Sequence, residues 1–352
     1  MMRILSRKMW SLMGRVFHSN FRDLTRPYRL NFVLTYQCNL KCQICNIWKK
    51  RAGNELTAEE IELFFKKNNY FSWIDITGGE LFLRKDLERI VRVLVAQCPN
   101  LYLLHFPTNG FMSERIVTVT REILSYFKQK LMITISLDGP ADLHDSIRGG
   151  KGSWERSIAI FKALKEIRRA NLEVYFGMTF SDKNVSLFRE TFNCARRLIP
   201  QLGYEDIHFN FIHNSGHYYE YTDARIGGDP RYLDALEEIL LTRKSSWYPV
   251  HLLEKEYLCG VREYLKTGRG PCLCEALSSS VFVAPEGSVY ACSIWDKKIG
   301  NLRETEFDLS KIIQSQESRR LRLQIKKKDC PGCWTPCEAY TAIMAHKMPF
   351  SK

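Results

Sequence analysis

The most informative absences in this 352-residue chain concern membranes and secretion. No run approaches the roughly 18 apolar residues of a membrane-spanning helix, so such a helix is excluded. The first twenty residues contain neither an unbroken apolar core nor a small-residue cleavage site, so no secretory signal is visible. No internal repeat, low-complexity segment or known nucleic-acid motif occurs, and nucleic-acid binding is not favoured. We expect a cytoplasmic protein.

Cysteine is too scarce for a disulfide-stabilised fold but too clustered to be incidental. The chain has 12 cysteines, well below the roughly 8–10% that marks a disulfide scaffold. Most of them fall in two groups with short spacings, which is typical of metal or cluster ligands in a reducing compartment.

Acidic residues are nearly absent from the first 30 positions, although the chain as a whole carries a net charge of +13. Seven cations stand there against Asp23 alone: Arg3, Arg7, Lys8, Arg15, Arg22, Arg26 and Arg29. Apolar residues recur among them near helical spacing: Ile4, Leu5, Met9, Trp10, Leu12, Met13, Val16 and Phe17. We favour a basic amphipathic helix that packs on the body of the fold, and the alternative is contact with an anionic membrane. A second basic run, 319–328, is predicted to be a solvated helix face.

Alternating strand and helix patterns run from residue 29 to about residue 211. The predicted strands are 29–34, 73–76, 101–106, 131–137, 172–179 and 206–211, and the predicted helices are 57–67, 86–97, 113–127, 153–168 and 184–199. Residues 57–60 read as a capping box that opens the first of these helices. Repeated strand–helix units predict an α/β fold, a partial (βα)6 barrel related to the TIM barrel.

The alternation stops after residue 211, where glycine and proline indicate a linker over 212–235. The remainder is a smaller, cysteine-rich α+β extension with one clear hairpin signal over 281–290. We therefore expect three parts: a basic N-terminal segment (1–28), the partial barrel (29–235) and the C-terminal extension (236–352).

Three cysteines, Cys38, Cys42 and Cys45, stand in the spacing C-x3-C-x2-C directly after the first predicted strand. A 4Fe–4S cluster normally takes four thiolates, so a loop that offers three leaves one iron without a protein ligand. A substrate or cofactor can bind that iron, which indicates reactive iron–sulfur chemistry. A structural zinc site is the alternative.

Polar and glycine-rich segments follow the next three predicted strands. They are Thr77-Gly78-Gly79-Glu80, Pro107-Thr108-Asn109-Gly110 and Ser136-Leu137-Asp138-Gly139, the last followed by His144 to Gly150. Glycines let the backbone approach a ligand closely, and a carboxylate beside them can hold an ammonium group. Because the carboxyl ends of parallel strands converge in a barrel, we expect these segments to surround one site with the cysteine loop.

The C-x3-C-x2-C loop, the Gly-Gly-Glu segment and the Ser-x-Asp-Gly strand end resemble, in this order, the motifs of the radical S-adenosylmethionine (AdoMet) superfamily over about residues 29–211. The resemblance implies that Cys38, Cys42 and Cys45 hold a 4Fe–4S cluster whose fourth iron binds the amino and carboxylate groups of AdoMet. It assigns to the AdoMet site Gly78, Gly79 and Glu80 at the ammonium, Ser136 and Asp138 at the ribose or carboxylate, and Asn109. Ile44 departs from the family, in which the residue before the third cysteine is often aromatic.

Six further cysteines lie in the C-terminal region: Cys272, Cys274, Cys292, Cys330, Cys333 and Cys337. Their arrangement around the predicted hairpin resembles the SPASM or twitch extension found in peptide- and metabolite-modifying members of the superfamily. Residues 144–150 also resemble the His-Asp-x-x-Arg-Gly segment of those members. The resemblance implies one auxiliary 4Fe–4S cluster, with Cys274, Cys292, Cys330 and Cys333 as the first choice of ligands and Cys337 as a replacement for one of the later pair. A structural zinc site is the alternative.

The other cysteines and histidines receive no chemical role. Cys98, Cys194 and Cys259 are isolated and predicted to be ordinary buried residues, and His105 is predicted to lie in the core or a pocket wall. Residues near the mouth of the barrel are His208, His213, His217, Tyr218 and Tyr219. No catalytic acid or base is assigned among them.

The resemblance implies an oxidoreductase or maturase. In that chemistry, an electron from the reduced cluster splits AdoMet, and the resulting 5′-deoxyadenosyl radical takes a hydrogen atom from the substrate, leading to oxidation or cross-linking. The implied partners are a peptide or small-molecule substrate and an external electron donor such as flavodoxin or ferredoxin. Only 37 residues precede Cys38, too few for the winged-helix leader-binding domain of many peptide maturases. The alternative is a non-catalytic iron–sulfur electron-transfer protein or a zinc scaffold.

Overall fold

A nine-stranded sheet organises the protein, with strand order β6-β5-β4-β3-β2-β1-β7-β8-β9. The computed structural model describes residues 7–51, 53–224, 226, 228–244 and 246–347. The strands are β1 (Arg29–Thr35), β2 (Trp73–Gly78), β3 (Leu103–Thr108), β4 (Lys130–Ser136), β5 (Leu172–Phe180), β6 (Ile207–Phe211), β7 (Ser280–Val283), β8 (Ser288–Tyr290) and β9 (Lys298–Asn301). Strands β1 to β6 are parallel, which confirms the predicted α/β partial barrel.

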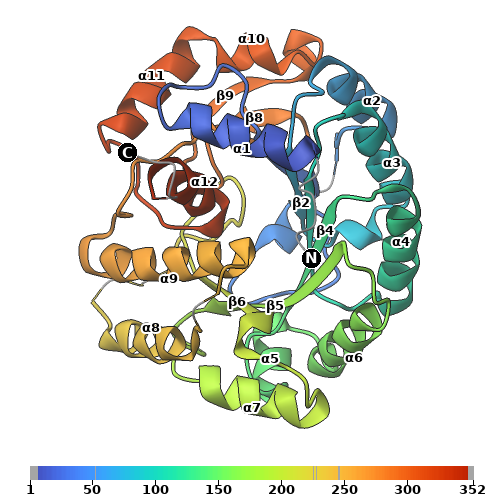
Figure 1. Ribbon diagram of the computed structural model, residues 1–352, viewed down its shortest axis with the longest axis vertical. Helices are drawn as coiled ribbons and strands as arrows, with labels where there is room; N and C mark the ends of the chain where they lie inside the picture. Colours follow the sequence, from blue (N-terminus) through green and yellow to red (C-terminus); the bar gives the residue numbers. More distant parts are fainter. Residues whose placement is uncertain (1–6, 52, 225, 227, 245, 348–352) are drawn as a thin grey trace.

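Helices surround the sheet, as Figure 1 shows. They are α1 (Arg7–Ser19), α2 (Ala58–Lys67), α3 (Leu87–Gln97), α4 (Ser113–Tyr126), α5 (Ala141–Arg148), α6 (Ser153–Lys165), α7 (Phe188–Leu198), α8 (Pro230–Thr242), α9 (Pro249–Thr267), α10 (Leu309–Ile313), α11 (Gln316–Lys326) and α12 (Pro336–His346). All five predicted barrel helices are present. The sequence patterns predict no helix over the segments that form α5, α8, α9, α10 and α12.

The capping box before α2 is formed as predicted. The Thr57 hydroxyl accepts a hydrogen bond from the Glu60 backbone N–H at 3.2 Å, and the Glu60 carboxylate accepts one from the Thr57 N–H at 2.9 Å. Ile61, Phe64 and Phe65 on the same helix are fully buried. The cap therefore fixes the start of a helix whose apolar face covers the sheet.

Side chains of the barrel strands alternate between the helices and the barrel interior, as the period of two requires. On β4, Leu131, Ile133 and Ile135 are fully buried beneath the surrounding helices. Met132 and Thr134, between them, line an internal cavity instead. The hydrophobic core therefore lies outside the barrel, between sheet and helices, and the inward face is free for another use.

The C-terminal region continues the same sheet. Strand β7 pairs in parallel with β1, and β8 then pairs antiparallel with β7. The turn between them places Gly287 at φ +83°, a conformation that favours glycine. The predicted hairpin is therefore confirmed, and it joins the cysteine-rich region to the first barrel strand.

Helix α1 lies across the barrel and packs against α12 (Figure 1). The Arg15 guanidinium donates hydrogen bonds to the backbone oxygens of Tyr70 and Arg26. For Arg7–Ser19 this confirms the favoured prediction of a helix on the body of the fold; Arg3, Ile4 and Leu5 lie outside the described residues. Every helix in the described part of the chain is too short or too polar to cross a bilayer.

The second basic run coincides with α11 and the residues after it. Arg319, Arg320 and Lys326 to Lys328 are exposed, and Arg320 forms an ion pair with Glu317 one turn earlier. The half-buried Arg322 donates to the Ile313 backbone oxygen at 3.1 Å. This run is a solvated helix face, as the sequence predicts.

Candidate active site

A cavity of about 1100 Å³ occupies the barrel interior and receives side chains from β1 to β6. Of the residues predicted to bind the first cluster and AdoMet, seven line it: Cys38, Cys42, Cys45, Gly78, Gly79, Asn109 and Ser136. Glu80 and Asp138 do not line it, and both are fully buried behind it. The structure therefore brings the cysteine loop and the strand ends together around one space.

The two glycines after β2 hold the chain that leads into the cysteine loop. A Cβ atom on Gly78 would lie 2.3 Å from the Thr35 backbone oxygen, and one on Gly79 would lie 2.1 Å from that of Gln37. In their place, the Gly79 and Glu80 N–H groups donate to these two oxygens at 2.8 Å. Glycine is required here because backbone packs directly on backbone.

The loop is supported from its other side by the end of α5. Gly149, at φ +62°, would place a Cβ atom 2.5 Å from the Lys41 backbone oxygen. The Gln43 N–H donates to the Ile147 oxygen at 2.8 Å. The position of Cys42 is therefore fixed through its two neighbours, Lys41 and Gln43.

Arg148 reaches from α5 to the cysteine loop. Its guanidinium forms a 2.5 Å ion pair with Asp138 and lies 4.0 Å from the Cys42 Sγ. Burial would lower the pKa of Arg148, but the facing Asp138 and Cys42 outweigh this effect and raise it. Asp138 thus positions a permanent positive charge beside the loop. The sequence places Arg148 in the His-Asp-x-x-Arg-Gly segment, but its contact with the cysteine loop becomes visible only in the structure.

His144, in the same motif, is a structural residue. Its Nδ1 accepts a hydrogen bond from the Asp138 N–H at 2.9 Å. Burial, followed by the charge of Arg148, lowers the pKa of His144 to about 3. The imidazole is therefore neutral and acts as an acceptor that fixes the end of β4.

Glu80 connects the ends of β2 and β3. Its carboxylate accepts hydrogen bonds from the Thr108 hydroxyl at 3.0 Å and the Asn109 N–H at 2.8 Å. Burial raises the pKa of Glu80 to about 7. The Asn109 side chain in turn donates to Asn39 at 2.8 Å, within the cysteine loop.

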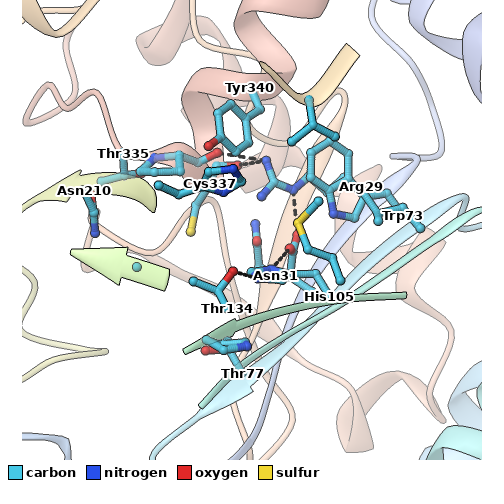
Figure 2. A pocket seen from close by; sticks show the side chains of 18 of the residues that line it. Arg29, Asn31, Trp73, Thr77, His105, Thr134, Asn210, Thr335, Cys337 and Tyr340 are labelled. Atoms are coloured by element: carbon cyan, nitrogen blue, oxygen red, sulfur yellow. Dashed lines mark hydrogen bonds and ion pairs between the residues drawn. The ribbon is translucent and has the colours of Figure 1, made fainter. Parts of the chain in front are cut away.

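A polar wall runs across β1 to β4 midway along the cavity (Figure 2). Arg29 donates to Asp75 at 2.7 Å, Asp75 pairs with His105 at 2.8 Å, and His105 contacts the Thr134 hydroxyl at 2.9 Å. Burial would raise the pKa of Asp75, but Arg29 and His105 lower it to about 2. Of these residues, the sequence reading identified only His105 as a candidate pocket wall, and this prediction is confirmed.

Five of the six C-terminal cysteines surround a second, much smaller cavity of about 60 Å³: Cys272, Cys274, Cys292, Cys330 and Cys333. Cys337 lines the barrel cavity instead, at the start of α12. Arg29 donates to the Pro336 and Cys337 backbone oxygens at 3.0 and 2.6 Å. The polar wall is thereby tied to the cysteine-rich region.

The remaining residues noted in the sequence are mostly structural. Cys98 is fully buried as predicted, whereas Cys194 and Cys259 are only half-buried, contrary to prediction. Each half-buried cysteine lies on an outer helix with one face toward solvent. Tyr218 is buried, lines the barrel cavity and shares a 2.9 Å hydrogen bond with the Thr77 hydroxyl.

The free thiols fit iron–sulfur ligation. All 12 cysteines are unpaired. Burial raises the pKa of Cys38 to about 11 and that of Cys45 to about 12, with smaller contributions from the neighbouring thiols. Within the described ranges, no three Cys, His, Asp or Glu side chains are gathered around a single metal ion. What supports the fit is three thiols on one loop, a cation beside them and an adjoining cavity, which match a cluster with one open iron.

Comparisons with known proteins agree with this chemistry. Residues 32–195 match the radical SAM superfamily, and residues 272–337 match an iron–sulfur cluster-binding domain, SPASM. The antilisterial bacteriocin subtilosin biosynthesis protein AlbA of Bacillus subtilis (strain 168) is 25% identical over 337 residues, 90% of this chain and 69% of AlbA. The AdoMet-dependent heme synthase of Methanosarcina barkeri (strain Fusaro / DSM 804) is 23% identical over 350 residues, 92% of this chain and 96% of that protein.

Solved structures share the fold. Native anSMEcpe with bound AdoMet has a TM-score of 0.58 at 16% identity, covering 83% of this chain and 82% of that one. Streptococcus suis SuiB bound to the precursor peptide SuiA has a TM-score of 0.59 at 15% identity, covering 96% and 76%. These similarities confirm the barrel with its C-terminal extension.

The matched families fix the cofactors and the general type of protein. The chain is an enzyme that uses AdoMet, a 4Fe–4S cluster and auxiliary iron–sulfur chemistry, which sets aside the non-catalytic alternative. The protein belongs to the radical SAM superfamily and carries a SPASM iron–sulfur cluster-binding domain at its C-terminal end.

Proposed function

We propose that this enzyme removes a hydrogen atom from a peptide or small molecule held in the barrel cavity, leading to oxidation or cross-linking. The observation that carries the proposal is that the three-cysteine loop and the polar wall open into the same space. When bound, the reduced cluster and AdoMet supply a 5′-deoxyadenosyl radical, and the protein contributes binding, orientation and exclusion of water. A substrate against the wall would lie in the same cavity as the cysteine loop.

Four cavity-lining residues would hold AdoMet: Gly78, Gly79, Asn109 and Ser136. The glycine pair packs directly on the backbone of Thr35 and Gln37, which holds its own backbone at the cavity wall beside the cysteine loop. Glu80 lies directly behind the pair, and an ammonium group nearby would favour its charged form. Asp138, also behind the wall, would act by holding Arg148 beside Cys42.

The second cavity suits an auxiliary cluster. We retain Cys274, Cys292, Cys330 and Cys333 as its ligands because all four line that cavity, with Cys272 as a further candidate. Cys337 is set apart, since it lines the barrel cavity and its chain is held by Arg29. Its position favours contact with the substrate over cluster ligation.

The relatives support more than one substrate class. AlbA is named for biosynthesis of the bacteriocin subtilosin, and SuiB was solved with a precursor peptide. The heme synthase is named for a small-molecule product. The proposed partners therefore remain a peptide or small molecule and an external electron donor such as flavodoxin or ferredoxin, in the cytoplasm, with the N-terminal segment at a membrane surface.

Assay of 5′-deoxyadenosine tests the proposal. The enzyme is reconstituted with iron and sulfide under anaerobic conditions, given AdoMet and a strong reductant, and analysed by chromatography. We expect 5′-deoxyadenosine from the wild type and about a thousandfold less from Cys42→Ala, because the loop then cannot hold its cluster. The isolated Cys259→Ala is the matched control and should behave as wild type. Equal product from Cys42→Ala and wild type would reject the proposal.

A further inference from the structure

We propose that the substrate is a membrane amphiphile with an uncharged, hydrogen-bonding head and a long apolar chain, which enters the barrel at the amino ends of its strands, beside α1. This inference rests on the proposed function, because it names the substrate class for the same cavity. Three observations support it: the length of the cavity along the barrel, the difference in polarity between its two halves, and the exposed residues around the end of the cavity at the amino ends of the strands.

The cavity extends along the whole barrel. At the carboxyl ends of the strands it is lined by the cysteine loop, Gly78 and Ser136. At the amino ends it is lined by Tyr102, immediately before β3, and Asn171, immediately before β5. Strand β4 has seven residues, which at about 3.3 Å each gives a path of roughly 20 Å. The closed eight-stranded barrel fills its interior with bulky side chains, whereas this six-stranded partial barrel keeps an open path along its strands.

The far end of this path is covered by α1, and its lining is mainly apolar, although Lys128, Gln129 and Lys130 also line the cavity at the start of β4. The helix lines the cavity with Met9, Leu12, Met13, Val16 and Phe17. Facing residues come from the segment that enters α9, from the start of α9 and from α12: Trp247, Val250, Leu252, Leu253 and Met344. A single amphipathic helix that contributes an apolar lining to a cavity can shift more easily than a packed strand. This end therefore suits an apolar chain.

The surface around this end carries all the exposed aromatic residues of the described chain. Trp10, Phe17 and Phe21 are 57%, 46% and 54% exposed, and Trp247 and Tyr248 are 94% and 38% exposed. Each belongs to α1, to the segment just after it or to the segment that enters α9. The other exposed large apolar residues of the described chain are leucines. Exposed aromatic rings beside an apolar entrance are typical of a protein that docks on a bilayer interface.

Charge on the same segment complements an anionic bilayer. Residues 7–28 carry five cations: Arg15, whose guanidinium is bonded to the body of the fold, and Arg7, Lys8, Arg22 and Arg26, which are exposed or half-buried. They face one carboxylate, Asp23, and that carboxylate is already paired with Lys326 at 2.7 Å. Basic side chains among exposed aromatics add electrostatic attraction to burial of the rings. We therefore commit to a lipid surface as the occupant of this face.

The polar wall indicates the head of the substrate. Asn31 projects from β1 into the cavity beside Arg29 and His105 (Figure 2), and it is 1% exposed. Both polar atoms of its amide lack a hydrogen-bond partner, which is costly for a buried group. The charges next to it are compensated, because Arg29 is paired with Asp75. A head that both donates and accepts hydrogen bonds but carries no charge satisfies Asn31 without leaving an unpaired ion.

Vesicle co-sedimentation of the reconstituted holoenzyme tests the surface. We expect binding to vesicles of phosphatidylcholine and phosphatidylglycerol in equal parts, with weaker binding to pure phosphatidylcholine. The double variant Trp10→Ala/Phe21→Ala removes two exposed rings that do not line the cavity, and should bind about tenfold more weakly. The matched control Leu241→Ala/Leu323→Ala removes exposed leucines elsewhere and should bind as wild type. Wild type that stays in the supernatant, or equal binding by both double variants, would overturn the inference.

A photoreactive probe tests the substrate class. Hexadecan-1-ol with a diazirine at its chain end should label peptides from α1 or α12. Hexadecan-1-ol should compete at least about fivefold better than hexadecyl phosphate or hexadecyltrimethylammonium, since a charged head gains no partner at the wall. Asn31→Leu should reduce labelling. Labelling confined to the outer surface, or better competition by a charged head or by an apolar peptide, would contradict an uncharged amphiphile.

The same preparations are assayed for 5′-deoxyadenosine. If cleavage of AdoMet is intact while vesicles and probe fail to bind as expected, the inference is wrong and the proposed function stands. If cleavage is absent from wild type, the proposed function itself is wrong, whatever the vesicles show.

Discussion

The two cysteine-rich regions of the molecule differ in the space that adjoins them. The first loop, with Cys38, Cys42 and Cys45, opens into a cavity of about 1100 Å³. The second group, around Cys292 and Cys333, encloses about 60 Å³. Three thiols beside a large space would leave room for a ligand on their cluster, whereas the four thiols proposed as ligands beside the small space would complete a cluster by themselves. The comparison predicts a reactive site in the first region and a closed one in the second.

The largest effect that separates the regions is expected from Cys333→Ala. The wild-type enzyme should contain about eight irons per chain and the variant about four, because Cys333 is one of the four proposed ligands of the second cluster. About eight irons in the variant would mean that Cys272 replaces Cys333 as a ligand. Formation of 5′-deoxyadenosine should remain within about threefold of wild type, while substrate conversion fails. Iron and sulfide analysis with the nucleoside assay checks both values. Loss of all iron would mean that the two regions do not form independently. Cys337→Ala, the matched control, should keep its iron.

Asp75→Asn weakens the contact that Arg29, in the polar wall of the barrel, makes with the C-terminal region. This change leaves the buried Arg29 without its ionic partner, although Arg29 also bonds to the backbone of Cys337. We expect a loss of about 3–5 kcal/mol in the free energy of unfolding. Asp229→Asn, in a more exposed ion pair with Arg231, should cost less than about 1 kcal/mol. Urea titrations followed by circular dichroism measure both, and equal losses would show that the polar wall does not couple the regions.

A matched pair of glycine substitutions sharpens the comparison. Gly149→Ala would place a methyl group 2.5 Å from the Lys41 oxygen, and Gly332→Ala would place one 2.8 Å from the Gly268 oxygen. Both residues have positive φ values, so each change should cost about 1–3 kcal/mol. In the Cys333→Ala enzyme, which keeps only the first region's cluster, Gly149→Ala should cause loss of the remaining iron. In the Cys42→Ala enzyme, which keeps only the second region's cluster, Gly332→Ala should do the same. Absorption spectra of the two double variants measure both losses. Loss of the same cluster through both glycine substitutions would contradict separate support of the two loops.

The smallest expected effect is a pH dependence confined to the first region. Burial raises the pKa of Glu80 to about 7, so its carboxylate becomes protonated as the pH falls through that value. If the ionised form supports the AdoMet ammonium, affinity for AdoMet should fall about tenfold between about pH 8 and pH 6. Glu80→Gln should bind more weakly and show a flat profile. Equilibrium dialysis measures the affinities, and a parallel slope in both proteins would exclude this role.

Much of the fold could be predicted because the barrel strands and helices carry clear periodic patterns. The six strands and five helices predicted between residues 29 and 211 all occur, with ends shifted by a few residues. Helices α5 and α10 were not predicted because they have only eight and five residues. Helices α8, α9 and α12 were not predicted because part of each buries against another helix, in a region without regular alternation. The pairing of β7 with β1 depends on contacts between residues about 250 positions apart, which local patterns do not encode.

Site residues could be predicted where they form a motif with a fixed spacing. They could not be predicted where their role depends on the direction in which the side chain points from its strand. The cysteine loop and the glycine pair were visible as spacings. Arg29, Asn31 and Asp75 look like scattered polar residues until the strand pleat shows that all three face inward. Cys333 and Cys337 are four residues apart, yet they line different cavities because α12 begins at Pro336 and turns the chain. Spacing alone cannot show that separation.

Electron paramagnetic resonance of the reduced Cys333→Ala enzyme, with and without AdoMet, tests the central claim most directly. With the second region disabled, a single cluster remains, on the loop of Cys38, Cys42 and Cys45. The open site predicts that AdoMet changes the g-values of this cluster. A spectrum unchanged by saturating AdoMet would mean that all four irons are already closed, and would contradict the account.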